Sequence, residues 1–546
     1  MAGAATVAGG VRPAAVAGLF YPADPAELRS EIGRFLDTAA AAFDAAALSR
    51  RAAEADPDRG HGPGGEGDGD CAAEDDEGGP ATSADATETA ASAATGPDDR
   101  TPGPGSAGAR SGEPLSRAAG TTATGAANWG EREAPKAVIA PHAGYRYSGL
   151  TAGFAYHALA PRRGQVERVI VVGPAHRVRV AGVGLSTARA WATPFGPMEV
   201  DAGACCLLEE LPGVVVADDA HAPEHSIEVH LPFVHEVFGN VPVVPLVVGR
   251  ATIATVAKVL DAVWGGGETA IVVSSDLSHY LDEASARQRD RSTATAVLEG
   301  RAADIGPHEA CGCLPIGGLL TAAVGHGLAP QLLDLRTSAD TAGEPSRVVG
   351  YGSFALRPPP TLSDDDRAWL LDLAKRAIDH ELRHGEPDPL ADVDVPVTLR
   401  RPGATFVTLE RDTELLGCIG SLDPRRPLWR DVARNARGAA FDDPRFAALA
   451  AGDLAGVSVE VSVLSPLQPL PAPSLEAVAA SLRPGIDGLV LSAGGRRGTF
   501  LPDVWDKIPE PEAFVRELVR KARWSEPWVD GAKAWRYTTT SFSSEA

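Results

Sequence analysis

Four short apolar runs, rich in β-branched residues, constrain the fold of this 546-residue chain more than any other feature. They alternate with helix-like stretches such as 251–264. Apolar runs without polar alternation are typical of strands buried on both faces of a sheet. We therefore predict an α/β fold in which helices cover both faces of a layered sheet. The four runs are KAVIA (136–140), RVIVVG (168–173), VPVVPLVVG (241–249) and AIVVSS (270–275).

A helix and then a polar segment precede the first of these strands. Asp24 is a suitable N-cap, Pro25 suits the first helical position, and Leu28 and Ile32 share one face, so we predict a helix over 20–37. Residues 51–130 contain 15 acidic and 5 basic side chains and few large apolar ones. Such a segment cannot bury enough apolar surface to offset the entropy of ordering it. We therefore predict a disordered insert within a domain spanning 1–356, and no role for Cys71 inside it.

A second domain is predicted to follow a proline-rich linker at 357–362. Ser363 and Asp366 form a capping pattern for a new helix, and Gly385 is suited to end it. The stretches after it include ATFVTLE, GCIGS and VSVEVSVLSP, which favour strands, and PEAFVRELVRKARW, which favours a helix. We therefore predict an α+β domain over 363–546.

Composition excludes several classes of protein. A net charge of −23 disfavours nucleic acid and anionic membrane surfaces as partners. No apolar stretch approaches the roughly 18 residues that a membrane-spanning helix needs, and the first twenty residues lack the pattern of a signal peptide. Six scattered cysteines do not form a disulfide framework. We expect a cytoplasmic protein whose important cysteines act as thiols or thiolates.

Polar side chains stand where three of the predicted strands end. His142 follows KAVIA, His176 follows RVIVVG, and Asp276 and His279 follow AIVVSS. Because the carboxyl ends of parallel strands meet at one edge of a sheet, we expect these side chains to converge. Two further motifs, each before a predicted helix, supply candidates for the same edge: EHSIEVH, with His225, Glu228 and His230, and CGCLPIG, with Cys311 and Cys313.

Imidazole and thiolate groups together suit iron, copper or zinc. A single histidine after a strand is more often a surface or capping residue, and a free cysteine is more often a small buried apolar one, so only the joint pattern favours a metal site. The spacing is not that of a zinc finger. Residues without convergent partners are assigned structural roles: Cys205, Cys206, His157, His235, His308 and His326.

Seven motifs in order resemble those of the MEMO family, whose fold is similar to that of the class III extradiol dioxygenases, non-heme iron enzymes that cleave aromatic rings. The resemblance covers about 12–356 apart from the insert. It implies that His142, His176 and Cys311 bind the metal and that Asp276 and His279 are their acid/base neighbours. The motifs are AGLFYPADPAELRSEI, IAPHAGYRYSG, VVGPAHRVRV, ATPFGPMEVD, EHSIEVHLPF, SSDLSHY and CGCLPIGGLL.

The sequence departs from the dioxygenases in the third ligand. Those enzymes hold Fe(II) with two histidines and one carboxylate, whereas Cys311 is a softer ligand that favours copper or a differently poised iron over zinc. We therefore expect redox or oxygenase-like chemistry rather than ring cleavage. In this interpretation His279 moves a proton, and Asp276 or Glu228 orients an imidazole. The remaining pair, His225 and His230, lines the pocket or caps a helix.

The segment from 363 to 546 resembles the AMMECR-type domain, through GATFVTLERDTELLGCIGSLDPRRPL, DVARNARGAAFDDPRF, VEVSVLSPLQPL and GLVLSAGGRRGTFLPDVW. That family usually has an arginine where this chain has Leu416, and Cys418 in the same motif is best explained as a buried strand residue. Arg496 and Arg497, in a glycine-rich turn, suit either an anion or solvent. The two resemblances together imply a bacterial three-part system, whose radical SAM component would be the partner.

Two other functions are consistent with the same residues. In one, the protein is a non-catalytic binding module, and the imidazoles of this pocket bind a peptide or phosphopeptide. Alternatively, a zinc ion in the pocket would activate water for hydrolysis. The metal content of the protein distinguishes the three hypotheses.

Overall fold

The computed structural model describes residues 10–55, 134–390, 394–412, 414–450, 452, 454–524, 528–529 and 531–544, with side chains described up to residue 46 in the first range. The opening helix α1 spans Pro25–Ala55 and is longer than the predicted 20–37. Its first backbone N–H groups are capped by Asp24, which accepts from Ala26 and Glu27. The predicted insert therefore begins with five helical residues, and from residue 56 to 130 it lies outside the described residues.

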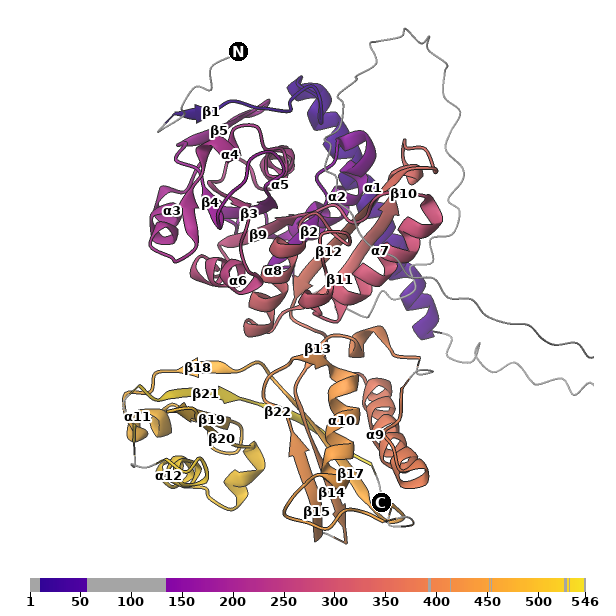
Figure 1. Cartoon of the computed structure of the whole chain (residues 1–546), viewed down its shortest axis with the longest axis vertical. Helices are drawn as coiled ribbons and strands as arrows, with labels where there is room; N and C mark the ends of the chain where they lie inside the picture. Colours follow the sequence, from indigo (N-terminus) through magenta and orange to yellow (C-terminus); the bar gives the residue numbers. More distant parts are fainter. Residues whose placement is uncertain are drawn as a thin grey trace, which may run out of the picture. The chain divides into compact units, whose positions relative to one another are not determined.

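The four apolar runs form the centre of a nine-stranded mixed sheet (Figure 1). They become β2 (Ala137–Ala140), β9 (Thr269–Ser274), β3 (Arg168–Pro174) and β8 (Val243–Val248), and these four are parallel neighbours in that order. Antiparallel pairs extend the sheet on both sides, where β12 joins β2 and β4 joins β8. The outer strands are β4 (Val183–Leu185), β7 (Val214–Val216), β10 (His279–Leu281), β11 (Ala329–Thr337) and β12 (Val348–Arg357).

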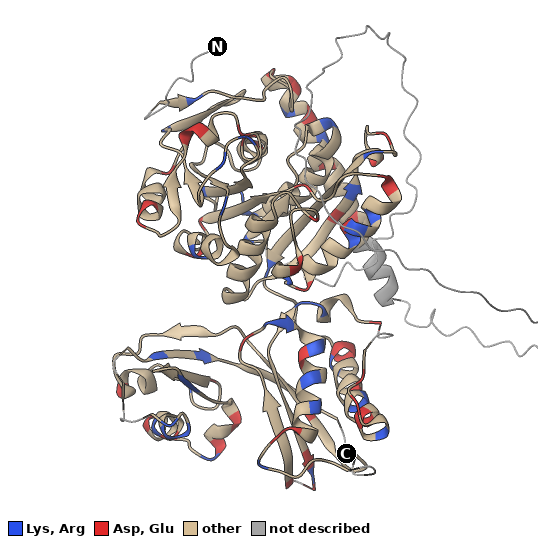
Figure 2. Ribbon diagram, viewed as in Figure 1, with Lys and Arg blue, Asp and Glu red and all other residues tan. Residues whose placement is uncertain are grey.

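Alternate residues of each central strand pack into two different hydrophobic cores. In β2, Ile139 belongs to a core shared with helices α6 and α8, whereas Val138 belongs to a core shared with α1, α2 and α5. Because successive side chains point to opposite faces of a sheet, helices cover both faces, as predicted. Figure 2 shows charged residues mainly on the surrounding helices and loops, and β2, β8 and β9 contain none.

The helices of this domain connect or flank the strands. They are α2 (Tyr145–Leu159), α3 (Ala202–Glu209), α4 (Asp218–His221), α5 (Leu231–Phe238), α6 (Ile253–Ala262), α7 (Glu283–Leu298) and α8 (Cys313–Gly325). A separate three-stranded sheet contains β1 (Val11–Arg12), β5 (Ala190–Thr193) and β6 (Gly196–Glu199).

The C-terminal part of the chain is α+β, as predicted. Its helix α9 (Asp364–His384) begins with a complete capping box between Ser363 and Asp366 and ends at Gly385, whose φ of 73° is left-handed. One antiparallel sheet has the order β15-β14-β17-β22 and a second has the order β18-β21-β19-β20. The strands are β14 (Thr405–Arg411), β15 (Glu414–Gly420), β17 (Ser458–Leu464), β18 (Gln468–Leu470), β19 (Gly488–Ala493), β20 (Arg496–Phe500), β21 (Lys533–Tyr537) and β22 (Thr539–Ser543), and the other helices are α10 (Leu428–Phe441), α11 (Leu475–Ala480) and α12 (Pro511–Lys521).

Among the described residues, no helix combines the length and the apolar character needed to cross a bilayer.

Candidate metal centre

Three adjacent parallel strands bring the predicted residues to one edge of the sheet. His142 lies two residues after β2, Asp276 two residues after β9, and His176 two residues after β3. Because β9 pairs with both β2 and β3 in parallel, these positions lie side by side at the carboxyl ends of the strands. Cys311 reaches the same edge from the loop before α8, where its N–H donates to the carbonyl of Asp276.

The donor atoms of His142, His176 and Cys311 all lie within 4.8 Å of one another. Nε2 of His142 is 3.5 Å from Sγ of Cys311, and the His142 and His176 rings are 5.1 Å apart between centroids. His142 is 2% exposed, whereas the His176 side chain is 29% exposed. The group is therefore buried on the His142 side and reaches solvent on the His176 side.

The hydroxyl of Ser274 determines which nitrogen of His142 carries the proton. Ser274 Oγ donates to the carbonyl of Ser226 at 2.5 Å, so its single proton is already used. It therefore accepts from Nδ1 of His142 at 2.6 Å and from Nε2 of His230 at 3.0 Å. Burial, with the His176 imidazole next in effect, lowers the pKa of His142 well below its usual value, so the ring is neutral near pH 7. Nε2 of His142 thus presents a lone pair toward Cys311.

Glu224 holds the second imidazole. Its Oε1 is 3.0 Å from Nδ1 of His176 and 3.1 Å from Nδ1 of His225, and Oε2 accepts the backbone N–H of His176 at 2.6 Å. Burial acts to raise the pKa of Glu224, but the hydrogen bonds from His176 and His225 outweigh it and hold that pKa well below its usual value. An ionised carboxylate only accepts, so Nδ1 of His176 donates and Nε2 remains to bind a ligand.

The thiol of Cys311 lies in a largely desolvated position. Burial, reinforced by the nearby carboxyl of Asp276, raises the pKa of Cys311 to about 12. Asp276 is itself buried, which raises its pKa, and its Oδ1 accepts the backbone N–H of His142 at 2.8 Å. Without a cation the sulfur is protonated near neutral pH. A bound cation would displace that proton, because metal coordination deprotonates a thiol.

The donor set fits a transition metal. Two imidazoles, each oriented through Nδ1 by a buried hydrogen-bond acceptor, and one sulfur lie close enough together to bind one ion. His142, His176 and Cys311 would hold the ion. A second group of donors, His176, Glu224 and His225, also lies within 4.8 Å, but there the Glu224 carboxylate is already engaged with both imidazoles.

The other predicted residues lie at differing depths around this group. His225 is close to it, with its ring 4.9 Å from that of His176 and 5.4 Å from that of His142. His230 is fully buried behind Ser274, where Tyr156 donates to its Nδ1 at 3.0 Å and burial lowers its pKa to about 3. His279 is half-buried on β10, where it opposes part of the rise that burial causes in the pKa of Asp276.

Glu228 does not orient an imidazole. Its carboxylate accepts from Arg12, Tyr21 and the backbone N–H groups of Ala15 and Val16, so it anchors the N-terminal segment. The orienting role proposed for it belongs to Glu224, four residues earlier. Sequence analysis missed Glu224 and Ser274. The signal available for Glu224 was its place directly before His225, and Ser274 is the next-to-last residue of the predicted strand at 270–275.

Among the described cysteines, Cys311 alone belongs to this donor group. Cys313 begins α8, two residues after Cys311. Cys205 is buried in α3 and Cys206 is exposed beside it. Cys418, in β15, accepts from Thr408 at 3.4 Å, and its backbone N–H donates to Asp443. Arg497 in β20 forms an ion pair with Asp423.

The fold and this site define an α/β protein with a His/His/Cys group at the carboxyl edge of its central parallel strands. Residues 111–355 match the family model described as Memo-like protein, and residues 371–542 match the model described as AMMECR1. The chain belongs to the MEMO1 family and carries an AMMECR1 domain after the Memo-like one.

Relatives of the Memo-like domain include MEMO1 family proteins of two archaea. The protein from Methanopyrus kandleri is 35% identical over 234 residues, which are 40% of this chain and 82% of that protein. The one from Pyrobaculum aerophilum is 35% identical over 238 residues, which are 40% of this chain and 81% of that protein. Among solved structures, the uncharacterized protein PH0010 from Pyrococcus horikoshii is 31% identical to this chain, with a TM-score of 0.32. The match covers 34% of this chain and 94% of that protein.

Proposed function

We propose that this chain is a cytoplasmic metalloprotein that binds iron or copper through His142, His176 and Cys311 and uses it for redox or oxygenase-like chemistry. The observation that carries the proposal is the convergence of these three donors, from distant parts of the sequence, within 4.8 Å. Two imidazoles and a sulfur favour iron and copper over magnesium or calcium, which prefer oxygen ligands. The bound ion would supply the one-electron chemistry that protein side chains lack.

The surrounding residues have distinct tasks in this proposal. Ser274 and Glu224 keep both imidazoles in the tautomer that leaves Nε2 available. The Cys311 thiol releases its proton when the ion binds, and Asp276, whose N–H donates to Sγ of Cys311 at 3.3 Å, positions the sulfur through its backbone. His279, half-buried beside Asp276, is suited to exchange protons between the pocket and solvent.

The two-domain arrangement suggests a partner. A Memo-like domain and an AMMECR1 domain occur here in one chain, which favours a shared task. We include in the proposal a radical SAM protein as the third component, because the resemblance of both domains to parts of a three-component system implies it. Co-purification of the full chain with that protein, in the presence and absence of metal, tests this part alone.

Metal analysis tests the central claim. The full chain is purified anaerobically, and its metal content is measured together with its electron paramagnetic resonance spectrum. We expect stoichiometric iron or copper in the native chain and its loss in Cys311→Ser and His142→Ala. Cys205→Ser is the matched control, because that cysteine is buried in α3 and outside the donor group. Stoichiometric zinc would support hydrolysis instead, and absence of any metal would support a binding module.

A further inference from the structure

A cavity of about 250 Å³ lies beside Cys311. Its walls come from the carboxyl ends of β3 and β8 and from the first turn of α8. It is thus formed at the same edge of the sheet as the candidate metal centre, next to the strand that presents His176. The lining includes Arg179, Val180, Val248, Arg250, Cys311 and Leu314.

The charged residues that line this cavity are all positive. Arg179 and Arg250 are its only ionisable residues apart from the two cysteines, and none of the lining residues is acidic. Neither guanidinium forms an ion pair with a carboxylate of the described residues, although the chain as a whole has a net charge of −23. Arg250 stands two residues after β8, the position that His176 occupies after β3. Two exposed arginines without carboxylate partners therefore line the same cavity as Cys311.

The helix α8 adds to the same positive potential. Its first three residues line the cavity, and no side chain caps its amino end at Gly312. The N–H of Cys313 donates to the carbonyl of Ala310, and Pro315 has no N–H group. The amino end of a 13-residue helix carries a partial positive charge that favours anions. The remaining lining is apolar, from residues such as Val180, Val248 and Leu314.

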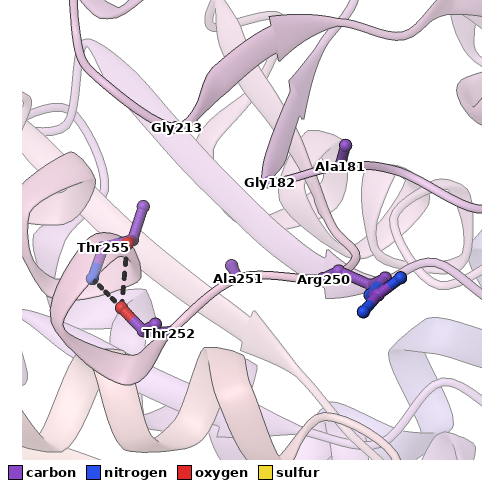
Figure 3. Close-up of a pocket in the computed structure, with 7 residues that line it drawn as sticks. All are labelled: Ala181, Gly182, Gly213, Arg250, Ala251, Thr252 and Thr255. Carbon is purple, nitrogen blue, oxygen red and sulfur yellow. Dashed lines mark hydrogen bonds between the residues drawn. The ribbon is translucent and has the colours of Figure 1, made fainter.

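Arg250 also lines a second, neighbouring hollow, but its side chain does not point toward the threonines there. It is lined by Ala181, Gly182, Gly213, Arg250, Ala251, Thr252 and Thr255. Figure 3 shows the Arg250 side chain extending away from Thr252 and Thr255, whose hydroxyls are hydrogen-bonded to each other at 2.9 Å. Its cationic group is thus not directed at the start of α6.

We propose that the cavity beside Cys311 binds a carboxylate carried on a compact apolar body, with Arg179 and Arg250 holding the carboxylate. The conclusion that this ligand is the substrate rests on the proposed function, because the cavity lies next to the metal-binding residues. The binding itself follows from the cavity alone. The volume corresponds to roughly eight water molecules at about 30 Å³ each, which suits a small organic acid.

The test uses the full chain with benzoate as the probe, benzamide as its neutral analogue and inorganic phosphate as a second anion. Isothermal titration calorimetry measures the Kd of each. We expect benzoate to bind roughly tenfold or more tightly than benzamide, because charge-assisted hydrogen bonds to guanidinium groups are stronger than neutral ones. We also expect the double variant Arg179→Gln/Arg250→Gln to lose that preference while binding benzamide unchanged.

Arg291→Gln controls for the loss of a positive charge at the surface, because Arg291 is exposed on α7 and lines neither cavity. It should bind benzoate as the native chain does, and thermal unfolding should show that all variants are folded. Equal affinity for benzoate and benzamide, or an equal loss in Arg291→Gln, overturns the proposal. Tighter binding of phosphate than of benzoate overturns the carboxylate assignment.

The metal measurement keeps this inference separate from the proposed function. Arg179→Gln/Arg250→Gln should retain the native metal content, since neither arginine belongs to the donor group. If the native chain binds metal but shows no preference for benzoate, only the ligand inference fails. If it prefers benzoate through the two arginines but holds no redox metal, the binding stands and the proposed redox function fails.

Discussion

Nδ1 of His142 lies 2.6 Å from the hydroxyl oxygen of Ser274, at the last position of β9. This contact couples a candidate metal ligand to the central sheet and determines its tautomer. Because the same hydroxyl also accepts from His230, one serine orders two buried imidazoles.

Ser274→Ala should weaken metal binding without removing a ligand. The change deletes the acceptor of the His142 Nδ1–H group, so the ring loses its fixed tautomer and orientation. Loss of such a supporting contact typically lowers metal affinity by about 10- to 100-fold. Competition against a chelator measures the affinity. Ser353→Ala is the control, since Ser353 is equally buried, in β12, and its hydroxyl contacts no imidazole. An unchanged affinity in Ser274→Ala would show that the tautomer does not matter.

Glu224→Gln should also lower metal affinity, by about 10- to 100-fold, through His176. The amide cannot replace the carboxylate, because its NH2 group would face N–H donors of His176. Glu228→Gln is the paired comparison, since that carboxylate contacts no imidazole. We expect Glu228→Gln to reduce stability while leaving chelator competition close to native, and equal losses of affinity in both variants would contradict the role given to Glu224.

The buried ion pair of Arg12 and Glu228 should dominate the anchoring of the N-terminal segment. Their side chains are 2% and 0% exposed, and NH1 of Arg12 is 2.6 Å from Oε2 of Glu228. Removing one member of a buried pair leaves the other charge uncompensated, which costs about 3–5 kcal/mol. We therefore expect Arg12→Ala to lower the free energy of unfolding in urea by about that amount.

A surface pair in the same domain provides the control for Arg12. Arg29 and Glu236 are 3.1 Å apart, with the Arg29 side chain 56% exposed. Exposed pairs contribute about 0–1 kcal/mol, so Arg29→Ala should change the urea midpoint little. Similar losses in Arg12→Ala and Arg29→Ala would mean that burial of the first pair has no energetic consequence.

Asp443 should make the C-terminal domain sensitive to acid. The hydrogen bond from Arg445, 2.7 Å away, holds the pKa of Asp443 well below its usual value, even though burial opposes the shift. A carboxyl with a depressed folded-state pKa stabilises above the ordinary value, near 3.9, and that contribution is lost as pH falls through the folded-state value. Asp443→Asn should therefore be less stable than the native chain at pH 7, and the difference should shrink below about pH 4.

Denaturation followed by tryptophan fluorescence at several pH values measures this difference. Asp442→Asn is the neighbouring control, because its side chain is 59% exposed and should show little pH-dependent effect. A stability difference for Asp443→Asn that stays constant from pH 7 to pH 3 would contradict the ion-pair explanation.

The sequence by itself determined the elements and the residues that end them. Runs of β-branched apolar residues are best buried as inner strands of a sheet, so the local pattern predicted the centre of the sheet. It also placed His142, His176 and Asp276 directly after their strands. Caps such as Ser363 were predictable for the same reason, since they depend on neighbours a few residues away.

Only the tertiary structure decided which polar groups meet. The order β2-β9-β3 places His142 beside Asp276. This order depends on the pairing of β2 with β9, which lie more than a hundred residues apart in the sequence. The hydrogen bonds of Glu224 with His176 and of Ser274 with His142 likewise depend on contacts between distant segments. No local periodicity specifies such contacts, because they arise when separate elements pack against one sheet and each buried polar atom must find a partner there.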